Sequence, residues 1–253
     1  MKKYTLNRYR RTPVYILLGK TIRKIYESLI ELITVPKLQE SFRHLPFSGQ
    51  AMQKLLQDYE FTSVLDIGSG EGVHANILRD HNKDVTTIDY GDSIYFERAE
   101  DTSEIARNTI IADFNEYNFI SKYDAVWCSH VLEHQANANI FLTKIYNLLS
   151  DGGVLAITVP PARNTMSGGH LTNWNAGLLL YNLVLAGFDC REASILKYGY
   201  NISLIVEKIP AAYPPLSYDS GDLRKIKKCL PDLNFFATEN DDPFNGNIFK
   251  INW

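Results

Sequence analysis

Short apolar runs alternate with segments of helical periodicity between residues 62 and 208. The apolar runs end at polar or glycine-rich turns, and they predict strands. The predicted strands are Ser63–Ile67, Val85–Asp89, Thr109–Ala112, Tyr123–Cys128 and Val154–Val159. Because apolar strands that alternate with helices form parallel sheets covered on both faces, this pattern predicts an α/β fold with a doubly wound, mostly parallel sheet.

Helices are predicted between these strands. They are Val73–Arg79, Glu133–Leu149 and Leu178–Leu185. We expect Asp151-Gly152-Gly153 to close the second helix, because glycine tolerates the positive φ of a helix C-terminus. Two further apolar runs, Ile195–Tyr198 and Ile202–Lys208, predict a closing hairpin around Gly199 and bring the sheet to seven strands.

Two flanks surround this predicted core of residues 61–208. Residues 209–253 are expected to form a C-terminal extension that wraps the core. Residues 1–60 look helical, and apolar residues such as Ile22, Ile25 and Leu29 recur at helical spacing. This N-terminal flank begins with many cations, which are Lys2, Lys3, Arg8, Arg10, Arg11, Lys20, Arg23 and Lys24. We expect it to pack on the core or cover the active site as a lid, and the alternative is a basic amphipathic helix that contacts an anionic membrane or a protein partner.

Composition narrows the class of protein. The 253 residues carry a formal net charge of −3, which argues against a nucleic-acid partner. The three cysteines are far apart and favour free thiols in a reducing compartment. The N-terminus lacks the pattern of a secretory signal, so the sequence predicts a cytoplasmic location, with a membrane-peripheral location as the alternative.

Ligands of open parallel sheets bind at the carboxyl ends of the strands, so the residues that follow each strand carry the candidate chemistry. Gly68-Ser69-Gly70-Glu71-Gly72 follows the first strand and opens a helix, where free N–H groups face a ligand. Asp89 ends the second strand, and Asp113-Phe114 follows the third. Ser129-His130-Val131-Leu132-Glu133-His134 follows the fourth strand, and a loop from Pro160 to His170 follows the fifth.

This ordered series resembles the class I S-adenosylmethionine-dependent methyltransferases, and it is similar to their small-molecule branch, which includes the ubiquinone-biosynthesis O-methyltransferases. The matching segments are Val64–Gly72, Val85–Asp89, Ile110–Phe114, Tyr123–His134, Gly152–Pro160 and Gly169–Phe188. A dinucleotide enzyme is the rival interpretation. The turn reads G-x-G-x-G, whereas the dinucleotide fingerprint reads G-x-G-x-x-G, which favours the sulfonium cofactor.

The resemblance implies roles for residues that bind S-adenosyl-L-methionine. Asp66 would help hold the methionine amino group, and Gly68 and Gly70 would let the cofactor lie against the backbone. Asp89 would bind the ribose diol, and Asp113 would accept a hydrogen bond from the adenine amino group. The remaining predicted cofactor residues are Phe114, beside the ring, and Ser129.

The stretch His130-Val131-Leu132-Glu133-His134 also fits H-x-x-E-H, a zinc-hydrolase pattern, which keeps a metal-dependent hydrolase as a less favoured alternative. In the ubiquinone O-methyltransferases the corresponding stretch reads Glu-x-x-Glu-His and is associated with a divalent cation. His130 replaces the first acid here, so we expect no metal. His130, His134 and His170 are instead the candidate bases for proton removal from a hydroxyl acceptor.

The acceptor is expected to be a small polar molecule or a glycan, methylated on oxygen. Arg163, Asn164 and Trp174 are the candidate acceptor-binding residues, because they lie in or next to the loop after the fifth strand. The second functional hypothesis is a cofactor-binding partner subunit that has the methyltransferase fold but no catalytic activity.

Overall fold

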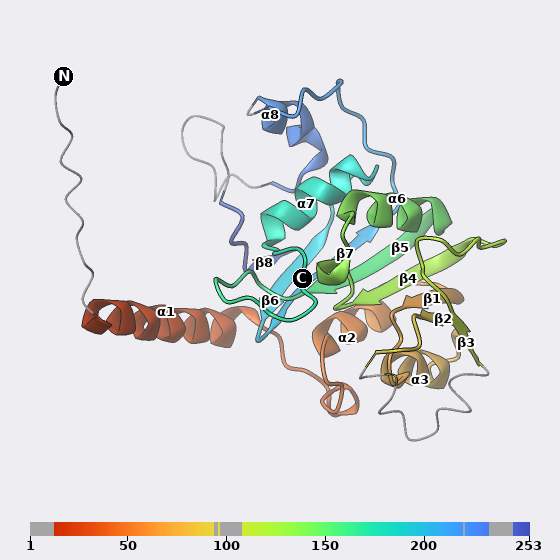
Figure 1. The fold of residues 1–253 in the computed structure, drawn as a ribbon, viewed down its shortest axis with the longest axis horizontal. Coiled ribbons are helices and arrows are strands. Elements are labelled where there is room, and N and C mark those ends of the chain that lie inside the picture. The colour runs from red at the N-terminus through yellow and green to blue at the C-terminus, as the bar shows by residue number, and fades with distance from the viewer. Residues whose placement is uncertain (1–12, 94–95, 97–107, 220, 233–244) are drawn as a thin grey trace.

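The computed structural model describes residues 13–93, 96, 108–219, 221–232 and 245–253, and its ordered part is built around one mixed sheet (Figure 1). The strands are β1 (Ser63–Ile67), β2 (Asp84–Asp89), β3 (Thr109–Ile111), β4 (Tyr123–Ser129), β5 (Leu149–Val159), β6 (Ser194–Tyr198), β7 (Asn201–Glu207) and β8 (Lys250–Ile251). The helices are α1 (Pro13–Thr34), α2 (Gly49–Asp58), α3 (Val73–Asp80), α6 (Ala138–Leu148), α7 (Ala176–Leu185) and α8 (Asp222–Ile226).

The strand order is β3-β2-β1-β4-β5-β7-β6-β8. Strands β1 to β5 pair with one another in parallel, and β7, β6 and β8 continue the sheet beyond β5 with antiparallel pairing. The predicted doubly wound, mostly parallel sheet is therefore confirmed. The described part of the sheet has eight strands where seven were predicted, because β8 adds a two-residue edge beside β6.

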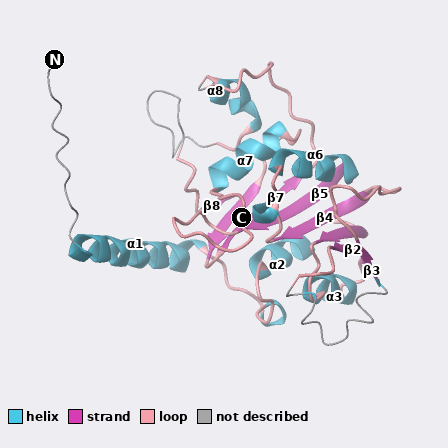
Figure 2. Ribbon diagram, in the orientation of Figure 1, coloured by secondary structure: helices cyan, strands magenta, loops and turns pink. Residues whose placement is uncertain are grey.

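Helices cover both faces of the sheet (Figure 2). Side chains alternate along β4: Val126 and Cys128 join the core under α6 and α7, whereas Ala125 and Trp127 join the core under α2 and α3. Burial on both faces explains why residues 125–128 of β4 are a continuous apolar run in the sequence. All three cysteines are buried and unpaired.

Two predicted boundaries were wrong. The helix expected over Glu133–Leu149 is divided into a 3-10 turn, Leu132–His134, and α6, which begins only at Ala138. The triplet Asp151-Gly152-Gly153 lies inside β5 and does not close a helix, because β5 pairs with β4 from Leu149 onward around an irregularity in register. The 3-10 turn matters for the site, since it sets the directions of Glu133 and His134.

The N-terminal flank contains two different elements. α2 is largely buried and packs against β5 and β7. α1 instead extends away from the rest of the molecule and touches it near its C-terminal end (Figure 1). Among the described residues, no helix is long and apolar enough to cross a membrane. The division of the chain at residues 60 and 208 stays a prediction.

Candidate functional site

The strand order reverses between β1 and β4, because the chain adds β2 and β3 on one side of β1 and then places β4 on the other. Open α/β sheets bind ligands in the crevice at such a reversal, outside the carboxyl ends of the strands. Ile67 and Ser129 end the two strands at this point, and Asp89 ends the neighbouring β2. The topology therefore gathers three of the predicted motifs at one edge.

The turn after β1 needs its glycines. Gly68 has a φ of +72°, and a Cβ atom there would lie 2.4 Å from Cγ2 of Val131. Gly70 and Gly72 also have positive φ, and Gly72 precedes the first residue of α3. A residue with a side chain would be strained and would clash at Gly68, so this turn keeps bare backbone at the helix N-terminus.

Two carboxylates lie beside the turn. Asp66 is buried in β1, and its Oδ2 has no hydrogen-bond partner. Burial, with the nearby charge of Asp89 as a smaller contribution, raises the pKa of Asp66 to about 7. Asp89 accepts hydrogen bonds from the N–H groups of Gly70 (2.8 Å) and Gly91 (3.0 Å), one on each oxygen. Each Asp89 oxygen therefore keeps acceptor capacity for a ligand hydroxyl.

These features fit a cofactor that has an ammonium group and a ribose. A buried carboxylate oxygen without a partner is costly, and a cationic ligand group would relieve that cost. The glycine turn lets backbone approach the ligand closely, and Ser69 places a second unpartnered oxygen, its Oγ, at the same turn. The charge and hydrogen-bonding capacity of these residues therefore agree with the predicted sulfonium nucleoside.

Asp113 and Phe114, which follow β3, differ in how well they fit their predicted roles. Asp113 Oδ1 accepts hydrogen bonds from the backbone N–H (2.7 Å) and the side-chain amide (3.2 Å) of Asn115, which fix its direction. Phe114 is buried and packs against Phe119 and Phe141, with ring centroids 5.8 and 4.9 Å apart. The ring of Phe114 therefore lies in the hydrophobic core. This packing does not support the predicted position of Phe114 beside the adenine ring.

His130 follows β4 in an unusual backbone conformation, with a φ of +57°. Its Nε2 is 2.9 Å from Oδ1 of Asn201, whose own amide donates to a backbone carbonyl. Nε2 must therefore carry a proton, since Asn201 Oδ1 only accepts. The other nitrogen, Nδ1, lies 3.2 Å from Oε1 of the buried Glu133. Each ring nitrogen of His130 therefore faces a polar side chain of the protein, Asn201 on one side and Glu133 on the other.

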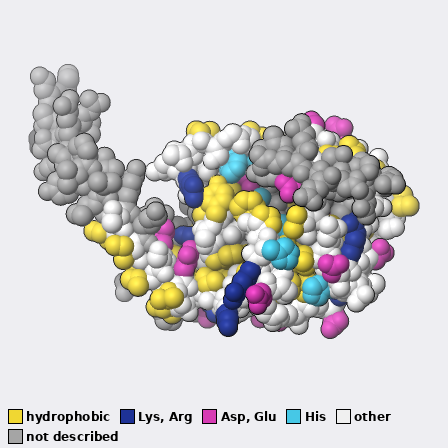
Figure 3. Space-filling model, turned by 90° about the horizontal axis from the view of Figure 1, so that it is seen from below, with side chains coloured by type: hydrophobic (Ala, Val, Ile, Leu, Met, Phe, Trp, Pro, Cys, Tyr) yellow, Lys and Arg dark blue, Asp and Glu magenta, His cyan; other side chains and the backbone are white. Residues whose placement is uncertain are grey.

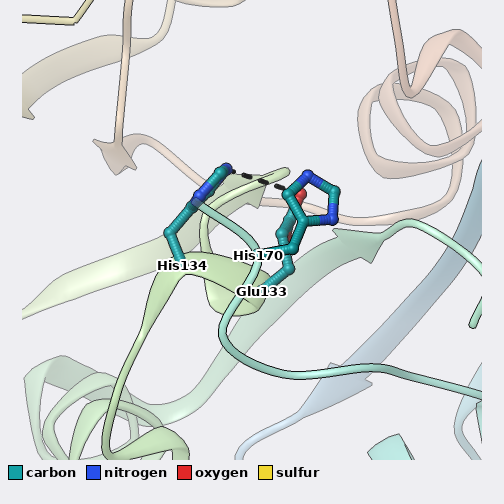
Figure 4. A group of neighbouring side chains, drawn as sticks. All are labelled: Glu133, His134 and His170. Atoms are coloured by element: carbon teal, nitrogen blue, oxygen red, sulfur yellow. Dashed lines mark ion pairs between the residues drawn. The ribbon is translucent and has the colours of Figure 1, made fainter. Parts of the chain in front are cut away.

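His134 has a free nitrogen. Its Nδ1 donates to the carbonyl oxygen of Gly169 at 2.8 Å, so the lone pair is on Nε2. This Nε2 lies 4.0 Å from Oε1 of Glu133, and the His170 ring stands edge-on to the His134 ring, with centroids 5.0 Å apart. Figure 4 shows the three side chains grouped together.

Glu133, His134 and His170 offer ligand atoms that all lie within 4.8 Å of one another. Two imidazoles and a carboxylate form a donor set that zinc and other transition metals accept, and the same set can move a proton. Glu133 Oε2 is buried and has no hydrogen-bond partner. This cluster is therefore the part of the site with the most available acid–base chemistry.

A polar pocket lies beside this cluster, formed by the loop after β5 and the β6–β7 turn. Its lining includes Arg163, His170, Asn173 and Tyr200, and the Arg163 guanidinium lies 4.3 Å from the centre of the Tyr200 ring. Of the other predicted acceptor residues, Asn164 is exposed in the same loop and does not line this pocket. Trp174 is buried in the core, where its Nε1–H donates to Thr172, so it does not line the pocket either.

Three residues at the site, Phe47, Ser48 and Tyr200, escaped the sequence analysis. Ser48 Oγ is 2.6 Å from Ser129 Oγ, and the ring of Phe47 lies 4.5 Å from that of His130. The segment before α2 therefore covers the end of β4. Tyr200 also reaches the site and stacks on His130 at 5.9 Å, although its only sequence signal was its place beside Gly199 in a predicted turn.

The comparisons with known proteins point to one family. The methyltransferase domain family matches residues 43–183, which is more than half of the chain. Malonyl-[acyl-carrier protein] O-methyltransferase of Salmonella typhimurium is 27% identical over 112 residues, which are 44% of each chain. The chain thus spans less than half the length of this relative.

Two further proteins are similar. A protein named "probable S-adenosylmethionine-dependent methyltransferase" from Mycolicibacterium smegmatis is 25% identical over 178 residues, which cover 67% of this chain and 68% of the relative. The solved structure of 1,6-didemethyltoxoflavin-N1-methyltransferase from Burkholderia thailandensis shares the fold, with a TM-score of 0.53 and 16% identity, over 76% of this chain and 88% of that one. The family match, the sheet and the strand-end residues agree, and the chain belongs to the class I S-adenosylmethionine-dependent methyltransferases.

Proposed function

We propose that this chain transfers a methyl group from S-adenosylmethionine to an oxygen of a small polar or glycan-type acceptor. The observation that carries the proposal is the arrangement at the β1–β4 reversal, where the unpartnered carboxylate oxygen of Asp66 lies near Asp89 and the glycine turn. The named activity of the Salmonella relative, an O-methyltransferase, supports oxygen as the methylated atom.

The chain's residues would hold the cofactor by complementary charge and hydrogen bonding. Asp66 would accept a hydrogen bond from the methionine amino group, and Asp89 would accept hydrogen bonds from the ribose hydroxyls. Asp113 would accept one from the adenine amino group. When bound, the cofactor supplies an electrophilic methyl group on a positively charged sulfur. The protein then has to align the acceptor with that group and exclude water. The side chains of Phe47 and Ser48 cover the end of β4, where they contact His130 and Ser129.

His134 is the best placed of the three candidate bases. Its Nδ1–H is fixed by Gly169, so its Nε2 can take a proton from an acceptor hydroxyl. Glu133 lies 4.0 Å from that Nε2 and would stabilise the imidazolium that forms. His130 faces Asn201 and Glu133 with its two nitrogens and is better suited to hold Glu133 in position. His170 lines the polar pocket beside the cluster, which we assign to the acceptor and call the acceptor pocket.

The polar pocket beside the cluster suits a polar group of the acceptor. Arg163 and Asn173 offer hydrogen-bond donors there, and the Tyr200 ring contacts both Arg163 and His130. The metal-free mechanism predicted from the sequence stays a prediction, and the alternatives stay testable. A cofactor-binding subunit would bind S-adenosylmethionine and methylate no acceptor. A metal-dependent hydrolase would contain stoichiometric metal and lose its activity to a chelator.

Calorimetry with S-adenosylmethionine and with S-adenosylhomocysteine tests the proposal first. We expect both to bind with one site per chain. A transfer assay with radiolabelled methyl groups and a panel of hydroxyl-bearing sugars and small acids then tests the acceptor class. No binding of either nucleoside would overturn the proposal, and labelled products carrying the methyl group only on nitrogen would overturn its oxygen assignment.

Cofactor binding should release a proton near pH 6. The pKa of Asp66 is raised to about 7, so most of this side chain is protonated in the free protein at pH 6. An ammonium group favours the ionised form, so the affinity for S-adenosylmethionine should rise up to about tenfold per pH unit between about pH 5 and 7. Calorimetry in two buffers with different ionisation enthalpies measures the released proton directly.

Asp66→Asn is the control for this release, because asparagine has no proton to lose. The raised pKa also means that Asp66 keeps its proton to a higher pH in the folded, ligand-free protein than in the unfolded chain. Its free energy of unfolding should therefore fall as the pH rises from about 4 to about 7. An unchanged proton release in Asp66→Asn would assign the released proton to another group.

A further inference from the structure

α1 presents an apolar face to solvent. Five large side chains on it are between 55% and 83% exposed, namely Ile22, Ile25, Leu29, Leu32 and Ile33. At about 100° per residue they fall within one arc of about 100° on the helix surface. The described part of α1 lies at the left of Figure 3, where hydrophobic side chains follow its surface.

The opposite face of α1 contacts the body of the protein. Glu31 Oε1 accepts a hydrogen bond from the backbone N–H of Gly199 at 2.8 Å, and Glu27 forms an ion pair with Lys197 at 3.6 Å. The helix therefore has its polar face inward and its apolar face outward, which is the reverse of an ordinary surface helix. An outward apolar face of this size marks a surface that binds something.

The charge of the chain identifies the occupant. Residues 1–26 contain eight of the 26 lysines and arginines and none of the 29 acids. An apolar stripe next to a cationic segment is the pattern of helices that lie in an anionic lipid interface. A second copy of this chain would bring two such cationic segments together, which disfavours pairing through this face.

We propose that α1 binds an anionic membrane surface and lies in its plane, with the Ile22–Ile33 side buried among the lipids. The inference is independent of the methyl acceptor. Gly199, which holds Glu31, precedes Tyr200 of the acceptor pocket, so the docked helix is attached directly to a wall of that pocket. Membrane binding would therefore take place next to the pocket that the proposed function gives to the acceptor.

Sedimentation of the full chain with lipid vesicles tests this proposal. The chain should bind vesicles with about 30 mol% phosphatidylserine in phosphatidylcholine at least tenfold more tightly than pure phosphatidylcholine vesicles, and about 0.5 M salt should weaken the binding. Absence of binding to the anionic vesicles would overturn the proposal. A dimer that Leu29→Asp separates, without vesicle binding, would assign the face to a second copy.

Two neighbouring substitutions separate the apolar contact from charge. Leu29→Asp and Ser28→Asp add the same charge one residue apart, and both side chains are exposed. Leu29 lies within the apolar arc and Ser28 lies outside it, so we expect at least a 50-fold loss for Leu29→Asp and at most about fivefold for Ser28→Asp. Equal losses would overturn the proposal. Cofactor binding, measured separately by calorimetry, should stay unchanged in both variants and reports on the fold and the proposed activity alone.

Discussion

Replacement of Asp89 by alanine should weaken the binding of S-adenosylmethionine at least 100-fold. Asp89 ends β2 at the crevice, and each of its oxygens retains acceptor capacity beyond the hydrogen bond from Gly70 or Gly91. Hydrogen bonds from two ribose hydroxyls to a carboxylate contribute about 3 kcal/mol together at the low end, which corresponds to about two orders of magnitude in affinity. Calorimetric titration with the cofactor measures the loss.

Two companion variants show whether the carboxylate itself is responsible. Asp89→Asn keeps one acceptor oxygen and should lose about tenfold. Asp84→Asn removes an exposed carboxylate at the other end of the same strand and should bind the cofactor normally. Thermal unfolding of each variant without ligand reports any loss of the Gly70 and Gly91 contacts. Wild-type affinity in a folded Asp89→Ala protein would contradict the assigned ribose contact.

Local chemistry explains why the parallel half of the fold could be predicted. β1 and β4 are buried on both faces, so apolar residues dominate their sequences, and β1 was predicted with its observed ends. The glycine turn was also readable, since three positive φ values in five residues demand glycine. These features depend on residues that are adjacent in the sequence.

The parts that escaped prediction depend on distant partners. β8 is a two-residue strand that forms by pairing with the edge of β6, more than 50 residues earlier in the chain. The 3-10 turn Leu132–His134 interrupts an apolar pattern that looked helical up to Leu149, and the carbonyl of Glu133 accepts backbone N–H groups from the distant Leu171 and Thr172. Periodicity alone carries no information on such contacts.

The candidate site divides in the same way. The acids at the strand ends follow from topology, because parallel strands bring their carboxyl ends to one edge. The ranking of the histidines does not follow from the sequence. It depends on Asn201 and Gly169, which lie 71 and 35 residues from the rings they contact and decide which nitrogen carries the proton.

Replacement of His134 by alanine should lower kcat about 100-fold or more, with the affinity for S-adenosylmethionine within about twofold of wild type. General-base catalysis contributes about 10²- to 10⁴-fold, and His134 is the histidine whose free nitrogen lies beside Glu133 and the acceptor pocket. Single-turnover methyl transfer at saturating cofactor separates this chemical step from binding. The exposed His81 caps the C-terminal end of α3, at the other end of that helix from the glycine turn, and provides a matched control; His81→Ala should keep the wild-type rate.

The same variant distinguishes proton transfer from metal binding at the Glu133, His134 and His170 cluster. If His134 acts as a base, the rate of the His134→Ala protein should rise again as the pH approaches the pKa of the acceptor hydroxyl, because the ionised acceptor needs no base. A chelator and added Mn²⁺ or Zn²⁺ should then change the wild-type rate by less than about twofold. A wild-type enzyme that loses activity to the chelator and regains it with one metal would assign the cluster to a cation, because two imidazoles and a carboxylate then act as ligands and His134 has no free lone pair for a proton.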